Sequence, residues 1–141
     1  MILSDNILID TGFWIGLLDP RDQHHDYAIE REEWLDVATL VVPWPIIYET
    51  VRTRLVRRPD KVSRFNYYLK RPNVFFLGDE DFREEAYALS VEYAYQRRPL
   101  SMVDMLCRLL IEDDNTRIDA LLTPNKQDFY DICTRTGTTI L

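Results

Sequence analysis

Several features typical of secreted, membrane and nucleotide-binding proteins are scarce or missing in this sequence. The chain has only two cysteines in 141 residues, Cys107 and Cys133, and their wide separation provides neither a disulfide framework nor a cysteine-based zinc site. No apolar stretch approaches the roughly 20 residues of a membrane span, and the first residues carry no basic leader. We therefore expect a cytoplasmic protein with no membrane association.

Glycine is also rare, which narrows the possible chemistry. With four glycines, the chain has neither a Gly-x-x-x-x-Gly-Lys phosphate loop nor a Gly-x-Gly-x-x-Gly fingerprint, so nucleotide-binding classes are unsupported. Because position 12 is Gly12, an aspartyl-phosphate phosphatase would lack its second aspartate two residues after Asp10. His24 and His25 would point about 100° apart on a helix, and no cysteine or third histidine supports them, so we expect surface or capping roles for both.

Apolar runs alternate with helical patterns along the whole chain. Strands are expected at 7–10, 39–43, 74–77, 120–123 and, less distinctly, 138–141. Helices are expected at 12–18, at 22–37, from Pro45 toward Arg58, at 60–70, from about Phe82 to Pro99 and at 101–113, with a short turn or helix around Asp128. In the helix at 22–37, the block Glu30-Arg31-Glu32-Glu33 is expected to face outward. The helix at 101–113 is expected to be sandwiched in the core. This alternation predicts one α/β domain over residues 1–141, with a mostly parallel sheet of four to five strands covered on both faces.

Charge is strongly segregated along the chain. The formal net charge is -7, yet residues 52–71 carry eight basic residues and one acid, which makes that segment +7 and the remainder -14. Phe65, Tyr67 and Tyr68 interleave with these cations, a mixture used to bind single-stranded nucleic acid. The alternative is a solvated pair of amphipathic helices whose aromatic rings face the core. The candidate RNA-binding residues are Arg52, Arg57, Arg58, Lys61 and Arg64.

Two acidic residues occupy positions suited to a site. Asp10 follows an apolar run and precedes a glycine-containing turn, and ligands of parallel sheets bind at the carboxyl ends of strands. Asp104 lies three residues after Ser101 at the start of the expected helix, where the pair resembles a capping box. Capping and ligand binding are compatible, because a helix N-terminus also stabilises an anion.

Glu49 and Asp128 have weaker local patterns. A helical projection places Glu49 near the edge opposite the apolar Ile46, Ile47, Val51 and Leu55, which favours an ordinary solvated glutamate. Asp128 follows a strand that ends near Thr123, so a turn hydrogen bond explains it equally well.

Four segments together resemble the PIN-domain family, which includes VapC-like toxins: residues 9–18 followed by Asp22 and His25, residues 47–50, residues 100–104 and residues 122–129. The resemblance spans nearly the whole chain and implies a three-layer α/β/α sandwich with metal-dependent ribonuclease activity. Asp10, Glu49 and Asp104 match the three acidic metal-site positions of the family, and Asp128 matches the acid that often precedes the aromatic residue of the last motif. Thr11 and Ser101 match small polar positions. Asn125 departs from the family, because many relatives have aspartate there.

The chemistry of such an acidic cluster can be stated independently of the family. Converging carboxylates repel one another and require a cation, for which Mg²⁺ or Mn²⁺ is suited. The ion would activate water for attack on an RNA phosphate, so no side-chain nucleophile is required.

The resemblance also implies partners for the protein. They are RNA, a homodimeric second copy and a cognate antitoxin, for which Trp14, Trp44 and Tyr48 are groove candidates unless they belong to the core. The alternative is a PIN-fold RNA-binding or protein-interaction module with weak or no nuclease activity.

Overall fold

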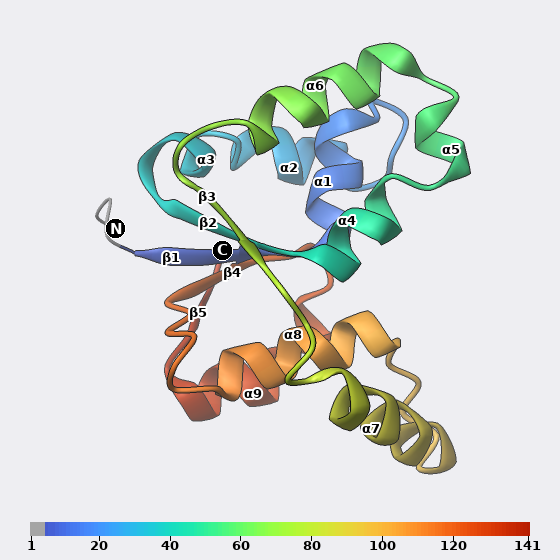
Figure 1. Ribbon diagram of the computed structural model, residues 1–141, viewed down its shortest axis with the longest axis vertical. Helices are drawn as coiled ribbons and strands as arrows, with labels where there is room; N and C mark the ends of the chain where they lie inside the picture. Colours follow the sequence, from blue (N-terminus) through green and yellow to red (C-terminus); the bar gives the residue numbers. More distant parts are fainter. Residues whose placement is uncertain (1–4) are drawn as a thin grey trace.

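The computed structural model describes residues 5–141 as a five-stranded parallel sheet between two layers of helices (Figure 1). The strands are β1 (Asn6–Ile9), β2 (Thr39–Pro43), β3 (Val74–Leu77), β4 (Ala120–Leu122) and β5 (Thr139–Ile140), in the order β3-β2-β1-β4-β5. The predicted α/β sandwich with a parallel sheet is therefore confirmed. Within residues 5–141, no helix is long and apolar enough to cross a membrane. The expectation that no basic leader begins the chain falls on residues 1–4, outside the described range.

The central strand β1 has neighbours on both sides, and this position explains its composition. Ile7, Leu8 and Ile9 are fully buried, since β2 and β4 flank the strand and helices cover both faces. A strand buried on both faces has a continuous apolar run rather than an alternating pattern. The run ends at Asp10, which places the first polar side chain at the carboxyl edge of the sheet.

The helices divide into two layers (Figure 1). One face of the sheet carries α1 (Thr11–Leu18), α2 (His25–Glu30), α3 (Trp34–Val37), α5 (Thr53–Val56) and α6 (Pro59–Leu69). The other face carries α7 (Arg83–Tyr95), α8 (Met102–Glu112) and α9 (Tyr130–Thr136). The helix α4 (Trp44–Thr50) begins directly where β2 ends, and the short 3₁₀ helix η1 (Lys126–Asp128) follows β4. Both α4 and η1 therefore lie at the same edge of the sheet as Asp10.

The helix predicted at 22–37 is wrong as a single element, because the chain breaks between α2 and α3. The break brings Glu32 against α6, where its carboxylate accepts hydrogen bonds from Arg64 at 2.9 Å and from the Tyr68 hydroxyl. The expected outward orientation of Glu32 is therefore wrong too. The helix predicted from Pro45 toward Arg58 also divides, because the backbone leaves helical geometry at Val51 and resumes as α5.

The aromatic residues have mixed roles. Trp14 is fully buried and packs edge-on against Phe65, so its assignment to a surface groove is wrong. Phe65 and Tyr68 also belong to the core, whereas Tyr67 is 63% exposed beside Arg71. The interleaved rings of the basic segment are thus mainly structural, as the amphipathic-helix alternative expects.

Two further features differ from the sequence-based expectation. The helix α9 was not expected, since the sequence predicted only a short turn or helix around Asp128, where η1 lies. On α8, Met102 is exposed although the whole helix was expected to be enclosed by the core. The first turn of α8 therefore projects beyond the packed layer.

Candidate active site

Asp10 is held at the junction of β1 and α1. It is the N-cap of α1, where its Oδ1 accepts a hydrogen bond from the Thr11 amide at 2.8 Å. Its Oδ2 accepts a hydrogen bond from the Thr123 hydroxyl at 2.9 Å, and Thr123 follows the neighbouring strand β4. The side chain is therefore fixed between two strand ends, and the residue is only 3% exposed.

Burial changes the protonation of this carboxyl. The loss of solvation raises the pKa of Asp10 to about 6, although the hydrogen bonds from Thr123 and Thr11 oppose the rise. The negative charges of Asp104 and Glu49 raise it further. A buried carboxyl beside two other acids is a feature of functional sites, because a cation near the group would reverse the cost of ionising it.

The three acids line one pocket of about 250 Å³. It contains most of the site residues predicted from sequence, brought together from the end of β1, from α4, from the N-terminus of α8 and from the loop after β4. The lining residues are Asp10, Thr11, Gly12, Ile15, Glu49, Arg52, Ser101, Asp104 and Asn125. We call this the carboxylate pocket.

Asp104 caps the helix α8 and also lines the carboxylate pocket. The Ser101 hydroxyl accepts a hydrogen bond from the Asp104 amide at 3.1 Å, and an Asp104 carboxylate oxygen accepts one from the Ser101 amide at 3.2 Å. This capping box fixes the start of α8 while both residues line the pocket. Glu49 is half-buried and also lines the pocket, because α4 begins directly at the end of β2.

Asp128 is not among the residues that line the carboxylate pocket. Burial raises its pKa above the ordinary aspartate value, and the charge of Asp104 contributes to the rise, so the two carboxylates interact electrostatically. Its backbone oxygen accepts a hydrogen bond from Arg108 at 2.9 Å. The structure thus places Asp128 beside the site, with its backbone anchored to α8.

The residues of the carboxylate pocket suit the metal ion that the family resemblance implies, although they do not form a complete set of ligands. Within residues 5–141, no three His, Cys, Asp or Glu side chains are arranged so that they could hold a metal as they stand. The pocket nevertheless offers oxygen ligands, and the buried Thr11 hydroxyl in its lining has no hydrogen-bond partner in the described part of the chain. Mg²⁺ keeps several waters and is commonly bound through one or two carboxylates plus a substrate phosphate, so the oxygen-lined pocket suits it without a complete protein cage.

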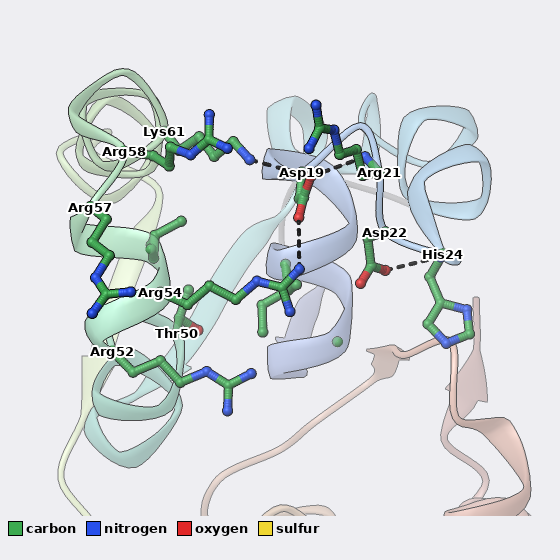
Figure 2. Close-up of a pocket in the computed structure, with 13 residues that line it drawn as sticks. Asp19, Arg21, Asp22, His24, Thr50, Arg52, Arg54, Arg57, Arg58 and Lys61 are labelled. Atoms are coloured by element: carbon green, nitrogen blue, oxygen red, sulfur yellow. Dashed lines mark hydrogen bonds and ion pairs between the residues drawn. The ribbon is translucent and has the colours of Figure 1, made fainter.

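A second pocket, of about 430 Å³, shares Gly12, Ile15 and Arg52 with the carboxylate pocket. Figure 2 shows its basic side chains extending from α5 and α6, from the residues that flank these helices and from the loop after α1. Six cations line it: Arg21, Arg52, Arg54, Arg57, Arg58 and Lys61. We call this the basic pocket.

The basic pocket contains four of the five cations proposed from sequence to contact RNA. Arg64 is not among its lining residues, because its guanidinium donates hydrogen bonds to Glu32 and to the Leu17 backbone oxygen. Arg21 was missed, since it lies about 30 positions before the basic segment and joins it only through the fold.

Three residues that position the site were also missed from the sequence. Thr123 holds Asp10, as described above. Arg108, buried on α8, makes a two-pronged ion pair with Asp131 of α9, with both N–O distances at 2.7 Å. A charged residue within an apolar helical pattern is a usable signal for such a buried pair, because an unpaired buried charge is costly.

No family model matches the chain, and no curated protein matches it in sequence. Among solved structures, the chain is similar to the crystal structure of Mycobacterium tuberculosis VapC20, described as a toxin that cleaves the sarcin-ricin loop. The fold is shared with VapC20. The TM-score is 0.63 over 82% of this chain and 86% of VapC20, with 22% sequence identity. At this identity the similarity establishes a common architecture, and the activity has to be argued from the site.

Proposed function

We propose that the protein is a metal-dependent endoribonuclease that hydrolyses RNA phosphodiester bonds at the carboxylate pocket. The observation that carries the proposal is the arrangement of two contiguous pockets with opposite charge. Three carboxylates line the first, six cations line the second, and Arg52 lines both. Carboxylates suit a divalent cation, whereas arginine and lysine suit the phosphates of a polynucleotide.

In this proposal Asp10, Glu49 and Asp104 hold Mg²⁺ or Mn²⁺. When bound, the ion supplies an activated water and stabilises negative charge on the attacked phosphate. The chain's own contribution is positional: Thr123 and the Thr11 amide fix the Asp10 carboxylate, and the capping box fixes Asp104. The Ser101 hydroxyl lines the pocket and can still donate a hydrogen bond to substrate, whereas the Thr11 hydroxyl is buried and has no hydrogen-bond partner within residues 5–141.

Asp128 and Asn125 have secondary roles in the proposal. Asn125 lines the carboxylate pocket, and its backbone N–H donates a hydrogen bond to the Thr123 hydroxyl at 3.1 Å. Asp128 adds negative charge next to Asp104, and we propose that it assists metal binding. We also propose that a second metal position is weaker in this protein, because Asn125 takes the place of a further acid.

The biological setting follows from the family resemblance. VapC20 is described as a toxin, and this chain shares its fold. We propose that the protein is the cytoplasmic toxin of a type II toxin-antitoxin pair, that it forms a homodimer and that a cognate antitoxin restrains it. Trp44 and Tyr48 are exposed on α4, the helix that carries Glu49, and are candidate antitoxin contacts.

The test is RNA cleavage by wild type, Asp10→Asn and Asp104→Asn with Mg²⁺, Mn²⁺ or EDTA. We expect cleavage only with a divalent metal and only in the wild type. Glu112→Gln is a matched control, because Glu112 is an exposed acid on α8 that pairs with Arg135 outside both pockets. RNase activity that persists in both Asp variants would come from a contaminant and would refute the proposal.

A second candidate function is an RNA-binding or protein-interaction module on the same fold. One observation favours it: no three potential ligands of residues 5–141 form a ready metal site. The family resemblance adds that many relatives have an aspartate where this chain has Asn125. The same assay separates the candidates, because a binding module would retain RNA without cutting it under any metal condition.

A further inference from the structure

The basic pocket gathers cations that the rest of the fold leaves unpaired. Arg21, Arg52, Arg57 and Arg58 all line it, and none of their side chains makes a hydrogen bond or ion pair recorded within residues 5–141. In a chain with a net charge of -7 there are enough acids to neutralise these guanidinium groups. The overall composition therefore does not explain why four unpaired arginines surround one pocket; the fold places them there.

The other two cations are organised by a single acid. The Asp19 carboxylate forms an ion pair with Lys61 at 3.2 Å and a longer one with Arg54 at 3.8 Å (Figure 2). The Arg54 side chain remains 82% exposed, so its guanidinium is only loosely committed to Asp19. Among the described residues, Asp19 and Asp22 are the only acids in the lining, so the pocket keeps an excess of positive charge. It has the size of a small-molecule site and is open to an anionic ligand.

The position of this charge relative to the carboxylate pocket is one-sided. Within the part of the chain that the structure describes, Arg52 is the only cation that lines the carboxylate pocket, and it also lines the basic pocket. Ser101, Asp104 and Asn125, which line the carboxylate pocket but not the basic one, are neutral or acidic. A phosphate chain passing through the carboxylate pocket therefore meets a cluster of cations in one direction along its path.

We infer that the basic pocket is a phosphate-binding subsite for RNA nucleotides on one flank of the cleaved bond, so that substrate recognition is asymmetric about that bond. The inference rests on the proposed nuclease function. Arg52 contacts the phosphate nearest the carboxylates, and Arg54, Arg57 and Arg58 contact the phosphates that follow. Arginine suits this role, because its planar fork of N–H groups matches two phosphate oxygens at once.

The first experiment measures binding without catalysis. Fluorescence anisotropy of a labelled single-stranded RNA is recorded in EDTA for wild type, Arg58→Glu and Lys70→Glu. Arg58 and Lys70 are exposed residues that flank the two ends of α6, so the variants make the same charge change, but only Arg58 lines the basic pocket. Thermal unfolding of each variant verifies that it is folded.

We expect Arg58→Glu to weaken RNA binding by about tenfold at low salt and to reduce the slope of log affinity against log salt by about one. Lys70→Glu is expected to change affinity less than about twofold. Equal affinities and equal slopes for the two variants would overturn the inference.

The second experiment tests the asymmetry. RNA substrates carry neutral methylphosphonate linkages either on the 5′ side or on the 3′ side of the mapped cleavage position. We expect one set to weaken binding to the wild type by about tenfold and the other to have little effect, with the sensitivity lost in Arg58→Glu. Equal losses from both sides would refute one-sided recognition.

The two proposals fail in different ways. If no RNA is cut but Arg58→Glu still weakens binding more than Lys70→Glu, the nuclease function fails and phosphate binding in the basic pocket stands. If RNA is cut in a manner dependent on Asp10 while the two Glu variants bind equally, the nuclease function stands and the subsite fails. Binding of an acidic protein partner, with no difference between the variants on RNA, counts as the latter outcome.

Discussion

Asp10→Asn is expected to make the metal-free protein more stable at neutral pH even though it removes the proposed activity. The wild-type carboxyl is almost completely buried beside Asp104 and Glu49, and its pKa in the folded protein is about 6. Asparagine has nearly the same shape, and its oxygen can still accept the hydrogen bond from the Thr11 amide. The variant therefore removes a charge and leaves the packing in place, but it loses the hydrogen bond that Oδ2 accepts from the Thr123 hydroxyl, because an amide nitrogen cannot accept one.

The magnitude follows from the pKa difference between the folded and unfolded chain. Below the unfolded value of 3.8, Asp10 is protonated in both states and its ionisation contributes nothing to stability. As the pH rises toward about 6, the unfolded chain ionises first, so the folded state is progressively disfavoured. A difference of two pKa units corresponds to about 3 kcal/mol, which is the penalty that the wild type carries at pH 7 and the variant does not.

Urea unfolding between pH 4 and pH 7 in EDTA measures this difference. We expect the stability of Asp10→Asn relative to wild type to increase by about 2 to 3 kcal/mol over that range. Glu112→Gln, which removes an exposed carboxylate, is expected to stay within about 0.5 kcal/mol of the wild type. Adding Mg²⁺ at pH 7 is expected to stabilise the wild type more than the variant. A stability difference that does not change with pH would refute the argument.

Three further expectations concern the groups that position the site. Asp131→Asn leaves Arg108 buried without its ion-pair partner and is expected to cost about 2 kcal/mol at pH 7, less than for a fully buried pair because Asp131 is 48% exposed. Hydrogen bonds from Arg108 hold the pKa of Asp131 well below its usual range, so the cost is expected to shrink as the pH falls below about 4; urea titrations at pH 7 and pH 3 that show a constant cost would contradict this. Gly16→Ala places a Cβ 2.9 Å from the His24 backbone oxygen, and we expect a loss of about 1 to 3 kcal/mol in thermal unfolding, whereas unchanged stability would mean that this packing is loose. Ser101→Ala is expected to cost about 1 kcal/mol by removing the cap of α8, and Ser101→Thr should recover most of it; equal losses would exclude capping as the cause.

The strands could be predicted because their determinants are local. Ile7–Ile9 form a continuous apolar run, and β2 and β3 were predicted with the bounds that the structure has. The breaks in the helices could not be predicted in this way. Glu32 is turned inward by Arg64 and Tyr68, which lie 32 and 36 residues further along the chain.

The candidate site also combines residues that local sequence could identify with residues that only the tertiary fold brings there. Asp10 and Asp104 were identifiable from their positions at a strand end and in a capping box. Glu49 had the local pattern of a solvated residue, and only the placement of α4 at the end of β2 brings it to the pocket. Asp128 was expected with these acids, but η1 places it beside the pocket rather than in its lining. Metal binding, RNA contact and the partners remain predictions.

The charge segregation of this acidic chain has an electrostatic consequence. The segment from Arg52 to Arg71 has a formal charge of +7 against -14 on the rest of the sequence, and although Lys61, Arg64 and Arg71 pair with acids outside it, the basic pocket keeps an excess of cations. We expect this region to attract a polyanion. Such a field orients an approaching nucleic acid before contact and raises the rate of productive encounters. The effect extends over about 10 Å at 0.1 M salt and about 3 Å at 1 M, so added salt should slow association while leaving the dissociation rate less affected.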